Sequence, residues 1–310
     1  MPSIDVLLAP KLSPLYAEQL NREFSVHPLP DLSAAARVRA VACGGESKIP
    51  AEVIAQLPAL EIISVMGVGY DGVDVQAAKS RGVMVTHTPD VLNDDVADVA
   101  LGLMLCTSRQ FPQADRFVRE GRWTQGAMPL QRKMSGARLG LVGMGRIGQA
   151  IAARALGFGM RIAYTARSAK PALPYAFHAD VRDLARESDF LVVITPGGEG
   201  TRKMINAEVL QALGSKGILV NVARGSVVDE AALIEALQNG VIGGAGLDVF
   251  ENEPKVPQAL MDMPQVVLTP HVGSATTQTR QAMADLAMDN LRAHFAGRPL
   301  KTPVPECRND

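Results

Sequence analysis

Short apolar runs alternate with amphipathic helical stretches along most of the 310 residues. In the first third, the pattern predicts strands over 4–8, 24–27, 38–43, 60–66 and 83–86, and helices over 14–21, 50–57 and 73–81. A longer helical stretch, 91–109, is apolar nearly all round. Alternation of this kind is typical of a parallel sheet with helices on both faces.

The alternation stops at a polar arm, 111–134, and starts again at Arg138. Strands over 138–142 and 161–165 enclose a helix over 147–158, and the pattern continues to about Pro270. The pattern predicts a closing amphipathic helix over 277–296 and a tail over 298–310. We therefore expect an α/β fold with two doubly wound parallel-sheet (Rossmann-like) domains.

Composition excludes several classes of function. The net charge of −1 and the absence of a basic patch argue against a nucleic-acid partner. No apolar run approaches the roughly 20 residues of a membrane span, and the first residues do not resemble a signal peptide. The cysteines, Cys43, Cys106 and Cys307, are scattered and form no C-x-x-C pair, so we expect reduced thiols, with Cys106 buried, and no metal site. These features predict a cytoplasmic protein.

The spacing G-x-G-x-x-G occurs twice. The second copy, Gly143 to Gly148, lies between a strand and a helix, as in dinucleotide-binding units. There Gly143 permits the tight turn, Gly145 lets a pyrophosphate approach the backbone, and Gly148 lets helix and strand pack closely. Arg146 adds a positive charge, and Ile147 begins the helix whose N–H groups face the phosphates.

The first copy, Gly67 to Gly72, also follows a strand but carries Asp71 within the loop. A carboxylate in this place would repel phosphates, so the loop favours an anion smaller than a pyrophosphate, such as a carboxylate. A purely structural turn is nearly as good an interpretation.

The type of nicotinamide cofactor is indicated by the end of the next strand. An NAD site is expected to place Asp or Glu about 20 residues beyond the glycines, yet no acidic residue occurs from Gln149 to Ala179. Arg167 and Ser168 stand there instead, and a guanidinium suits a 2′-phosphate. NADPH is the predicted cofactor; a solvated arginine with relaxed cofactor choice is the alternative.

Three residues that follow predicted strands have the chemistry needed to reduce a 2-oxo acid. Arg224 can bind the carboxylate and carbonyl oxygens as a fork. His271 can donate the proton to the forming alkoxide, and Glu253 can accept its other N–H and orient the ring. The remaining histidines, His27, His87, His178 and His294, have no comparable setting.

Three segments around these residues resemble the motifs of a known family. They are Asn-Val-Ala-Arg-Gly ending at Gly225, Gly-Leu-Asp-Val-Phe-Glu-Asn-Glu-Pro ending at Pro254, and Thr-Pro-His-Val-Gly ending at Gly273. The chain is similar over nearly its whole length to the D-isomer-specific 2-hydroxyacid dehydrogenases, within their glyoxylate/hydroxypyruvate reductase branch. The resemblance implies a homodimer whose chain has a substrate-binding domain, 1–96 plus 286–310, and a dinucleotide-binding domain, 97–285, with a cleft between them.

The resemblance also implies roles that spacing does not show. Val68 and Gly69 would bind the substrate carboxylate through backbone N–H groups. Further cofactor contacts would come from Thr195, Pro196, Val222, Ala223, Asp248 and Gly273. Two alternatives stay open: a reductase of bulkier 2-oxo acids such as hydroxyphenylpyruvate, and a non-catalytic protein that senses dinucleotides.

Overall fold

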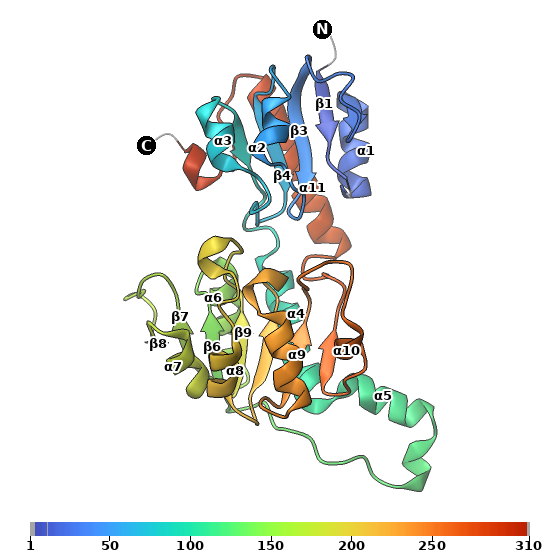
Figure 1. Cartoon of the computed structure of the whole chain (residues 1–310), viewed down its shortest axis with the longest axis vertical. Coiled ribbons are helices and arrows are strands. Elements are labelled where there is room, and N and C mark those ends of the chain that lie inside the picture. Colours follow the sequence, from blue (N-terminus) through green and yellow to red (C-terminus); the bar gives the residue numbers. More distant parts are fainter. Residues whose placement is uncertain (1–3, 11, 309–310) are drawn as a thin grey trace. The chain divides into compact units, whose positions relative to one another are not determined.

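A computed structural model describes residues 4–10 and 12–308 of the chain. The chain divides into two compact units (Figure 1). Unit 1 comprises Met1–Leu92 and Thr276–Asp310, and unit 2 comprises Asn93–Ala275.

Unit 1 is built on a five-stranded parallel sheet with the order β2-β1-β3-β4-β5. Its strands are β1 (Asp5–Leu8), β2 (Ser25–Pro28), β3 (Val38–Gly44), β4 (Ile62–Met66) and β5 (Met84–Thr86). Its helices are α1 (Pro14–Glu23), α2 (Ala51–Ala55), α3 (Val75–Ser80) and α11 (Thr277–Phe295), with a 3₁₀ turn η4 (Pro305–Cys307). This strand order is one of the two common doubly wound arrangements.

The C-terminal segment belongs to the core of unit 1. Val304 and Cys307 are buried in the same cluster as Leu7, Ile63 and Val85, and the Val304 N–H donates to the Val85 carbonyl at 2.9 Å. The prediction of a tail over 298–310 is therefore wrong. Pro299, Pro303 and Pro305 interrupt any regular helix or strand in this segment, but Val304 and Cys307 fill space that the sheet and helices leave open.

Unit 2 is built on a seven-stranded parallel sheet with the order β12-β11-β10-β9-β6-β7-β8. Its strands are β6 (Arg138–Val142), β7 (Arg161–Thr165), β8 (Ala176–Phe177), β9 (Phe190–Val193), β10 (Ile218–Asn221), β11 (Gly244–Leu247) and β12 (Val266–Leu268). Its helices are α4 (Asn93–Arg109), α5 (Phe111–Arg119), α6 (Arg146–Leu156), α7 (Val181–Arg186), α8 (Ala207–Leu213), α9 (Glu230–Gln238) and α10 (Gln258–Met261). The 3₁₀ turns are η1 (Arg122–Gln125), η2 (Glu199–Thr201) and η3 (Gly225–Val227).

In unit 2, the side of the sheet on which successive strands are added changes at β6, the first strand of the unit. From β6 the chain first builds outward through β7 and β8, then returns to the other side of β6 and builds β9 to β12. Open α/β sheets bind ligands beyond the carboxyl ends of the strands at such a reversal. The predicted fold class, two doubly wound parallel-sheet domains, is confirmed.

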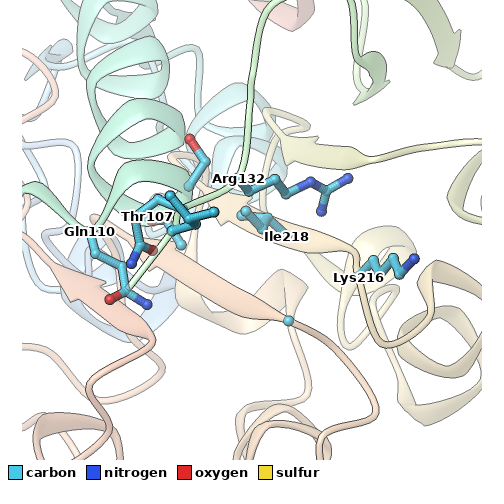
Figure 2. Close-up of a pocket in the computed structure, with 9 residues that line it drawn as sticks. Thr107, Gln110, Arg132, Lys216 and Ile218 are labelled. Carbon is cyan, nitrogen blue, oxygen red and sulfur yellow. The ribbon is translucent and has the colours of Figure 1, made fainter. Parts of the chain in front are cut away.

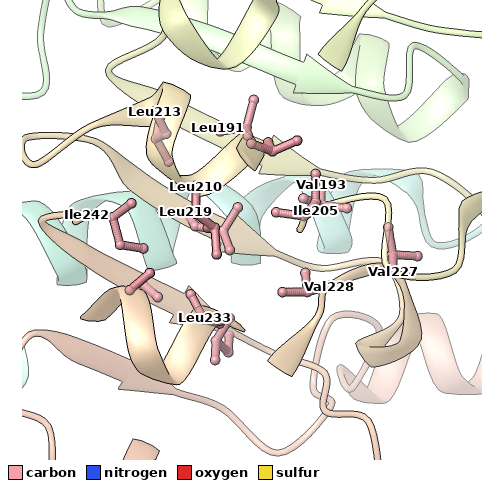
Figure 3. Packing of buried hydrophobic residues seen from close by; sticks show 14 of the residues in the cluster. Leu191, Val193, Ile205, Leu210, Leu213, Leu219, Val227, Val228, Leu233 and Ile242 are labelled. Carbon is pink, nitrogen blue, oxygen red and sulfur yellow. The ribbon is translucent and has the colours of Figure 1, made fainter. Parts of the chain in front are cut away.

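Helices cover both faces of the larger sheet. Helices α4 and α6 pack together, and α7, α8 and α9 follow one another as neighbours (Figure 1). In the cluster of Figure 3, Leu191 and Leu219 from the strands lie against Leu210 and Leu233 from α8 and α9. Each such side chain stabilises the fold by about 1.5–3 kcal/mol when it is fully buried. This packing holds the strand ends of the site in fixed register.

The arm over 111–134 is less irregular and less polar than expected. It contains α5 and η1, and it exposes Phe111 (46%), Val118 (56%), Trp123 (68%) and the whole of Leu130. No residue of α5 is buried.

Among the described helices of the whole chain, none has both the length and the apolar composition that crossing a membrane demands. Of the cysteines, Cys43 and Cys307 are buried, whereas Cys106 is only partly so, contrary to expectation.

Candidate active site

Because all the strands of unit 2 are parallel, their carboxyl ends meet at one edge of the sheet. Along this edge, in the order of the strands, lie most of the residues expected to bind cofactor or substrate. They are Arg167 and Ser168 after β7, Gly143 to Gly148 after β6, Thr195 and Pro196 after β9, Val222, Ala223 and Arg224 after β10, Asp248 and Glu253 after β11, and His271 and Gly273 after β12.

The turn after β6 has the shape that a dinucleotide phosphate group needs. Gly143 has a φ of +114°, and a Cβ there would lie 2.7 Å from the Ile194 carbonyl oxygen. A Cβ on Gly148 would lie 2.4 Å from the Gly143 carbonyl oxygen, so only glycine lets α6 begin this close to the strand. A Cβ on Gly145 would have no neighbour within 4 Å, so the backbone is open where a ligand would approach. Gly145 is the N-cap of α6 and offers no capping side chain, so a bound anion can take that role. The glycines therefore fit a pyrophosphate.

The loop after β7 is tied to the glycine turn. The Gly143 N–H donates to the Thr165 carbonyl at 3.0 Å. The buried Tyr164 hydroxyl accepts the Lys170 N–H at 2.6 Å and closes the loop that carries Arg167 and Ser168. Both of these side chains are exposed. The loop that carries a cation and a hydroxyl is thus tied to the glycine turn, and the contact of these two side chains with a ribose 2′-phosphate stays a prediction.

The segment after β9 also borders the turn, since a Cβ on Gly143 would lie 3.0 Å from the Thr195 nitrogen. Thr201 donates through its hydroxyl to the Pro196 carbonyl at 2.7 Å and stabilises this segment.

Arg224 is held by a side chain whose role the sequence did not suggest. The buried Asn221 accepts the Ala223 N–H at 3.1 Å and donates to the Arg224 carbonyl at 3.0 Å, which closes a tight turn at the end of β10. An Asn whose side chain bonds the backbone two residues on is a common turn device and was the available signal. The Arg224 Nη1 donates to the Ala223 carbonyl at 2.7 Å, which directs the guanidinium along the strand end.

Gly225 brings this turn against the loop after β11. A Cβ at Gly225 would lie 1.9 Å from the Phe250 carbonyl carbon and 2.3 Å from the Glu251 nitrogen. This close approach fixes the relative positions of Arg224 and the loop that carries Glu253.

The centre of the site is a pair formed by Glu253 and His271. His271 Nδ1 lies 2.8 Å from Glu253 Oε2, and the two side chains are 29% and 20% exposed. Glu253 Oε1 accepts the Phe250 N–H at 2.9 Å, so both carboxylate oxygens are engaged. The loop is further held by Glu230, which accepts the Glu251 N–H at 3.2 Å. Burial raises the pKa of Glu230.

Asp248 anchors the turn on which His271 stands. Its carboxylate accepts hydrogen bonds from the Val272 N–H (2.8 Å), the Gly273 N–H (2.9 Å) and the Thr269 hydroxyl (2.6 Å), and its backbone carbonyl accepts the His271 N–H at 2.9 Å. His271 has a φ of +52°, a left-handed backbone conformation that costs conformational energy in any residue other than glycine. The four bonds hold that conformation, so in this unit Asp248 is a positioning residue. Its expected contact with the nicotinamide stays a prediction.

In unit 1, the loop after β4 carries Val68 and Gly69. The glycines that flank this pair are required by packing: a Cβ on Gly67 would lie 2.9 Å from the Gly45 Cα, and one on Gly72 would lie 2.1 Å from the Ser47 carbonyl oxygen. The first glycine spacing thus shapes a turn, and whether this turn also binds a carboxylate stays a prediction. The exposure of Val68 and Gly69 is intermediate, so their backbone is within reach of a small ligand.

A separate hollow of about 350 Å³ lies at the opposite edge of the larger sheet. Figure 2 shows Thr107, Gln110, Arg132, Lys216 and Ile218 around it. Ile218 begins β10, whereas Arg224 follows its end. The Arg132 guanidinium is engaged by Asp189 at 3.0 Å and lies over the Phe190 ring. This hollow is therefore distinct from the edge at which the predicted residues gather.

Comparison with known proteins gives consistent matches. Residues 101–273 match the family described as "D-isomer specific 2-hydroxyacid dehydrogenase, NAD binding domain". Glyoxylate/hydroxypyruvate reductase A of Arabidopsis thaliana and hydroxyphenylpyruvate reductase of Plectranthus scutellarioides are each 46% identical, over 98% of this chain and 100% of theirs. The NADPH-dependent glyoxylate/hydroxypyruvate reductase of Sinorhizobium meliloti, solved with NADP and malonate, is 47% identical over 99% of both chains, with a TM-score of 0.93.

Proposed function

Because the chain belongs to the D-isomer-specific 2-hydroxyacid dehydrogenase family, we propose that it uses NADPH to reduce a small 2-oxo acid of the glyoxylate or hydroxypyruvate type to the D-2-hydroxy acid. The observation that carries the proposal is the Glu253–His271 pair at the same sheet edge as the glycine turn after β6. Unit 2 binds the dinucleotide in this proposal, and unit 1 contributes to substrate binding.

The residues divide the chemistry in a way that their hydrogen bonds support. NADPH supplies the hydride when it is bound. Arg224 binds the substrate carboxylate and carbonyl oxygens and stabilises the negative charge that develops on the carbonyl. Because a carboxylate can only accept, His271 Nδ1 carries a hydrogen toward Glu253. Proton transfer to the forming alkoxide therefore takes place from Nε2.

The preference for NADPH follows from the loop after β7. No carboxylate stands between Gln149 and Ala179 to bind a 2′-hydroxyl or to repel a phosphate, and Arg167 and Ser168 are exposed beside the glycine turn. The similar S. meliloti protein is an NADPH-dependent reductase. An initial-rate comparison of NADPH with NADH tests this preference directly.

Variants of Arg224 and His271 test the assignment of the catalytic residues. R224Q and H271Q should each lower kcat/KM for glyoxylate or hydroxypyruvate by about 10²-fold or more, the scale of an acid–base or oxyanion contact. R161Q removes a charge at the opposite edge of the sheet, and H178Q breaks the other His–Glu pair of unit 2, His178 with Glu187. These controls should retain nearly full activity. Near-normal activity of R224Q or H271Q would refute the assignment.

The size of the substrate side chain requires its own measurement. The A. thaliana and P. scutellarioides relatives are equally similar to the chain, although their names specify small and aromatic 2-oxo acids respectively. A panel of glyoxylate, hydroxypyruvate and hydroxyphenylpyruvate, compared by kcat/KM with NADPH, separates the two classes. We expect the smaller acids to be preferred.

A homodimer is the assembly that we propose. Phe111, Val118, Trp123 and Leu130 expose apolar side chains along one arm, and exposed apolar groups gathered in this way are typical of a protein–protein interface. Light scattering coupled to gel filtration should give twice the mass of the chain, and a W123S/L130S variant should shift toward the monomer. A monomeric parent protein would contradict the proposal.

A further inference from the structure

The loop that carries Val68 and Gly69 is fastened to the segment that follows β5. The Thr88 N–H donates to the Gly67 carbonyl at 2.8 Å. His87 Nδ1 lies 2.9 Å from the Val68 carbonyl oxygen. A carbonyl oxygen can only accept, so His87 Nδ1 carries the hydrogen and donates it. Two successive carbonyls are thus bound by one short segment.

These two bonds determine where the next two N–H groups point. In a planar trans peptide, the C=O and the N–H of the same unit point in opposite directions. Because the Gly67 and Val68 carbonyls are directed toward residues 87 and 88, the N–H groups of Val68 and Gly69 are directed away from them. Among the described residues, neither of these N–H groups donates a hydrogen bond. Adjacent backbone N–H groups with a shared direction are typical of a site for a carboxylate.

His87 is itself held in place on several sides. It is 7% exposed, its N–H donates to the Thr302 carbonyl at 3.1 Å, and its carbonyl accepts the Thr302 hydroxyl at 2.6 Å. Its ring lies edge-on to the Tyr70 ring, with centroids 5.3 Å apart. Thr302 is bound in turn by the fully buried Asn290 of α11. The loop therefore rests on a network that extends into the C-terminal segment.

We propose that His87 is a positioning residue for the substrate: its Nδ1–H orients the Val68–Gly69 peptide so that the two N–H groups converge on the carboxylate of the 2-oxo acid. This inference rests on the proposed function and extends it to a side chain that does not touch the substrate. Without the donor, the Val68 carbonyl loses its partner and the peptide can rotate. The carboxylate would then meet a less well-ordered pair of donors.

A matched pair of variants tests the hydrogen bond. In H87N the side-chain NH₂ takes the place of Nδ1, whereas H87L has a similarly branched side chain without a donor. We expect H87L to raise the KM for glyoxylate and the Ki for oxalate about tenfold, the scale of one neutral hydrogen bond. The kcat should stay within about threefold of the parent value, because the lost contact binds the substrate and the transition state equally. The Kd for NADPH should not change. H87N should restore both raised constants.

The possible outcomes distinguish a failure of the proposed function from a failure of the proposed role of His87. A parent protein that reduces no 2-oxo acid would refute the proposed function before any variant is compared. If the parent is active, unchanged KM and Ki in H87L would overturn the role of His87. Equal losses in kcat and NADPH affinity in both variants would also overturn it, because they indicate a general structural role. If H87L does not fold, T302V removes the hydroxyl that binds the His87 carbonyl. A rise in KM and Ki then supports the inference, and unchanged values overturn it.

Discussion

Replacing Glu253 with glutamine would remove the charge next to His271 and leave the shape of the site nearly intact. The amide oxygen of Gln can still accept the Phe250 N–H that Glu253 Oε1 accepts at 2.9 Å. Its NH₂ would face His271 Nδ1, where Oε2 now lies 2.8 Å away. An amide NH₂ opposes a hydrogen on Nδ1, so the variant disfavours the charged imidazolium form.

The size of the effect can be worked out from this geometry. Two unit charges about 4 Å apart attract by about 4 kcal/mol at an effective dielectric constant of 20. Because the side chains are 29% and 20% exposed, we take the smaller value of about 1.5–3 kcal/mol for a hydrogen bond between charged groups. Since about 1.4 kcal/mol corresponds to one pH unit, the imidazolium should lose its proton one to two pH units earlier in E253Q.

The assay is the pH profile of kcat/KM for reduction with NADPH. A proton donor must be protonated to act, so activity falls as rising pH removes its proton. In E253Q the midpoint of that alkaline limb should move down by about one to two pH units. E251Q removes a charge from the same loop, where Glu251 faces Arg202 at 3.9 Å, and should leave the midpoint in place. An E253Q profile that superimposes on that of the parent would refute the reasoning.

Two further predictions follow from the same edge of the sheet. R167D should raise the KM for NADPH at least tenfold, because a charged contact with the 2′-phosphate is replaced by repulsion, and it should lower the KM for NADH; if the parent already prefers NADH, the argument fails. G225A should lower the melting temperature by roughly 3–10 °C, since overpacking costs about 1–3 kcal/mol and the new Cβ would lie 1.9 Å from the Phe250 carbonyl carbon. G200A, whose Cβ would meet nothing within 4 Å, is the control, and equal melting temperatures for the two variants would contradict the packing argument.

Elements with a strong local signal could be predicted from the sequence. The strands β6 and β7 have the predicted bounds, because each is an apolar run that ends at glycine or polar residues. The glycines after β6 specify a turn that few other sequences can form. The reacting groups could be predicted for a similar reason: the chemistry limits the candidates for an anion clamp, a proton donor and its partner to a few residue types. Arg224, Glu253 and His271 are of those types.

Elements that depend on distant contacts could not be predicted in this way. Val304 and Cys307 enter the core of unit 1 because the sheet leaves space for them, and no local pattern records that space. Helix α5 begins immediately after α4, with Gln110 between them at a φ of +49°. The predicted helix over 91–109 ends where α4 ends, but the segment after it was interpreted as a polar arm and not as a helix.

The supporting hydrogen bonds of the site form a third class, in which the residue type gives almost no information. Asp248 was predicted only to meet the cofactor, which remains a prediction, and the bonds by which its carboxylate holds the turn at His271 were not foreseen. His87 showed no setting comparable to that of His271 in the sequence, and the structure places it against the Val68 carbonyl. A backbone N–H or carbonyl can be bound by many side chains, so chemistry does not restrict the choice as it does for a proton donor. What selects Asp248 and His87 is position alone, at the ends of parallel strands next to the turns that they hold. For this fold, positioning residues should therefore be sought among buried polar side chains at strand ends, whereas reacting residues can be sought by type.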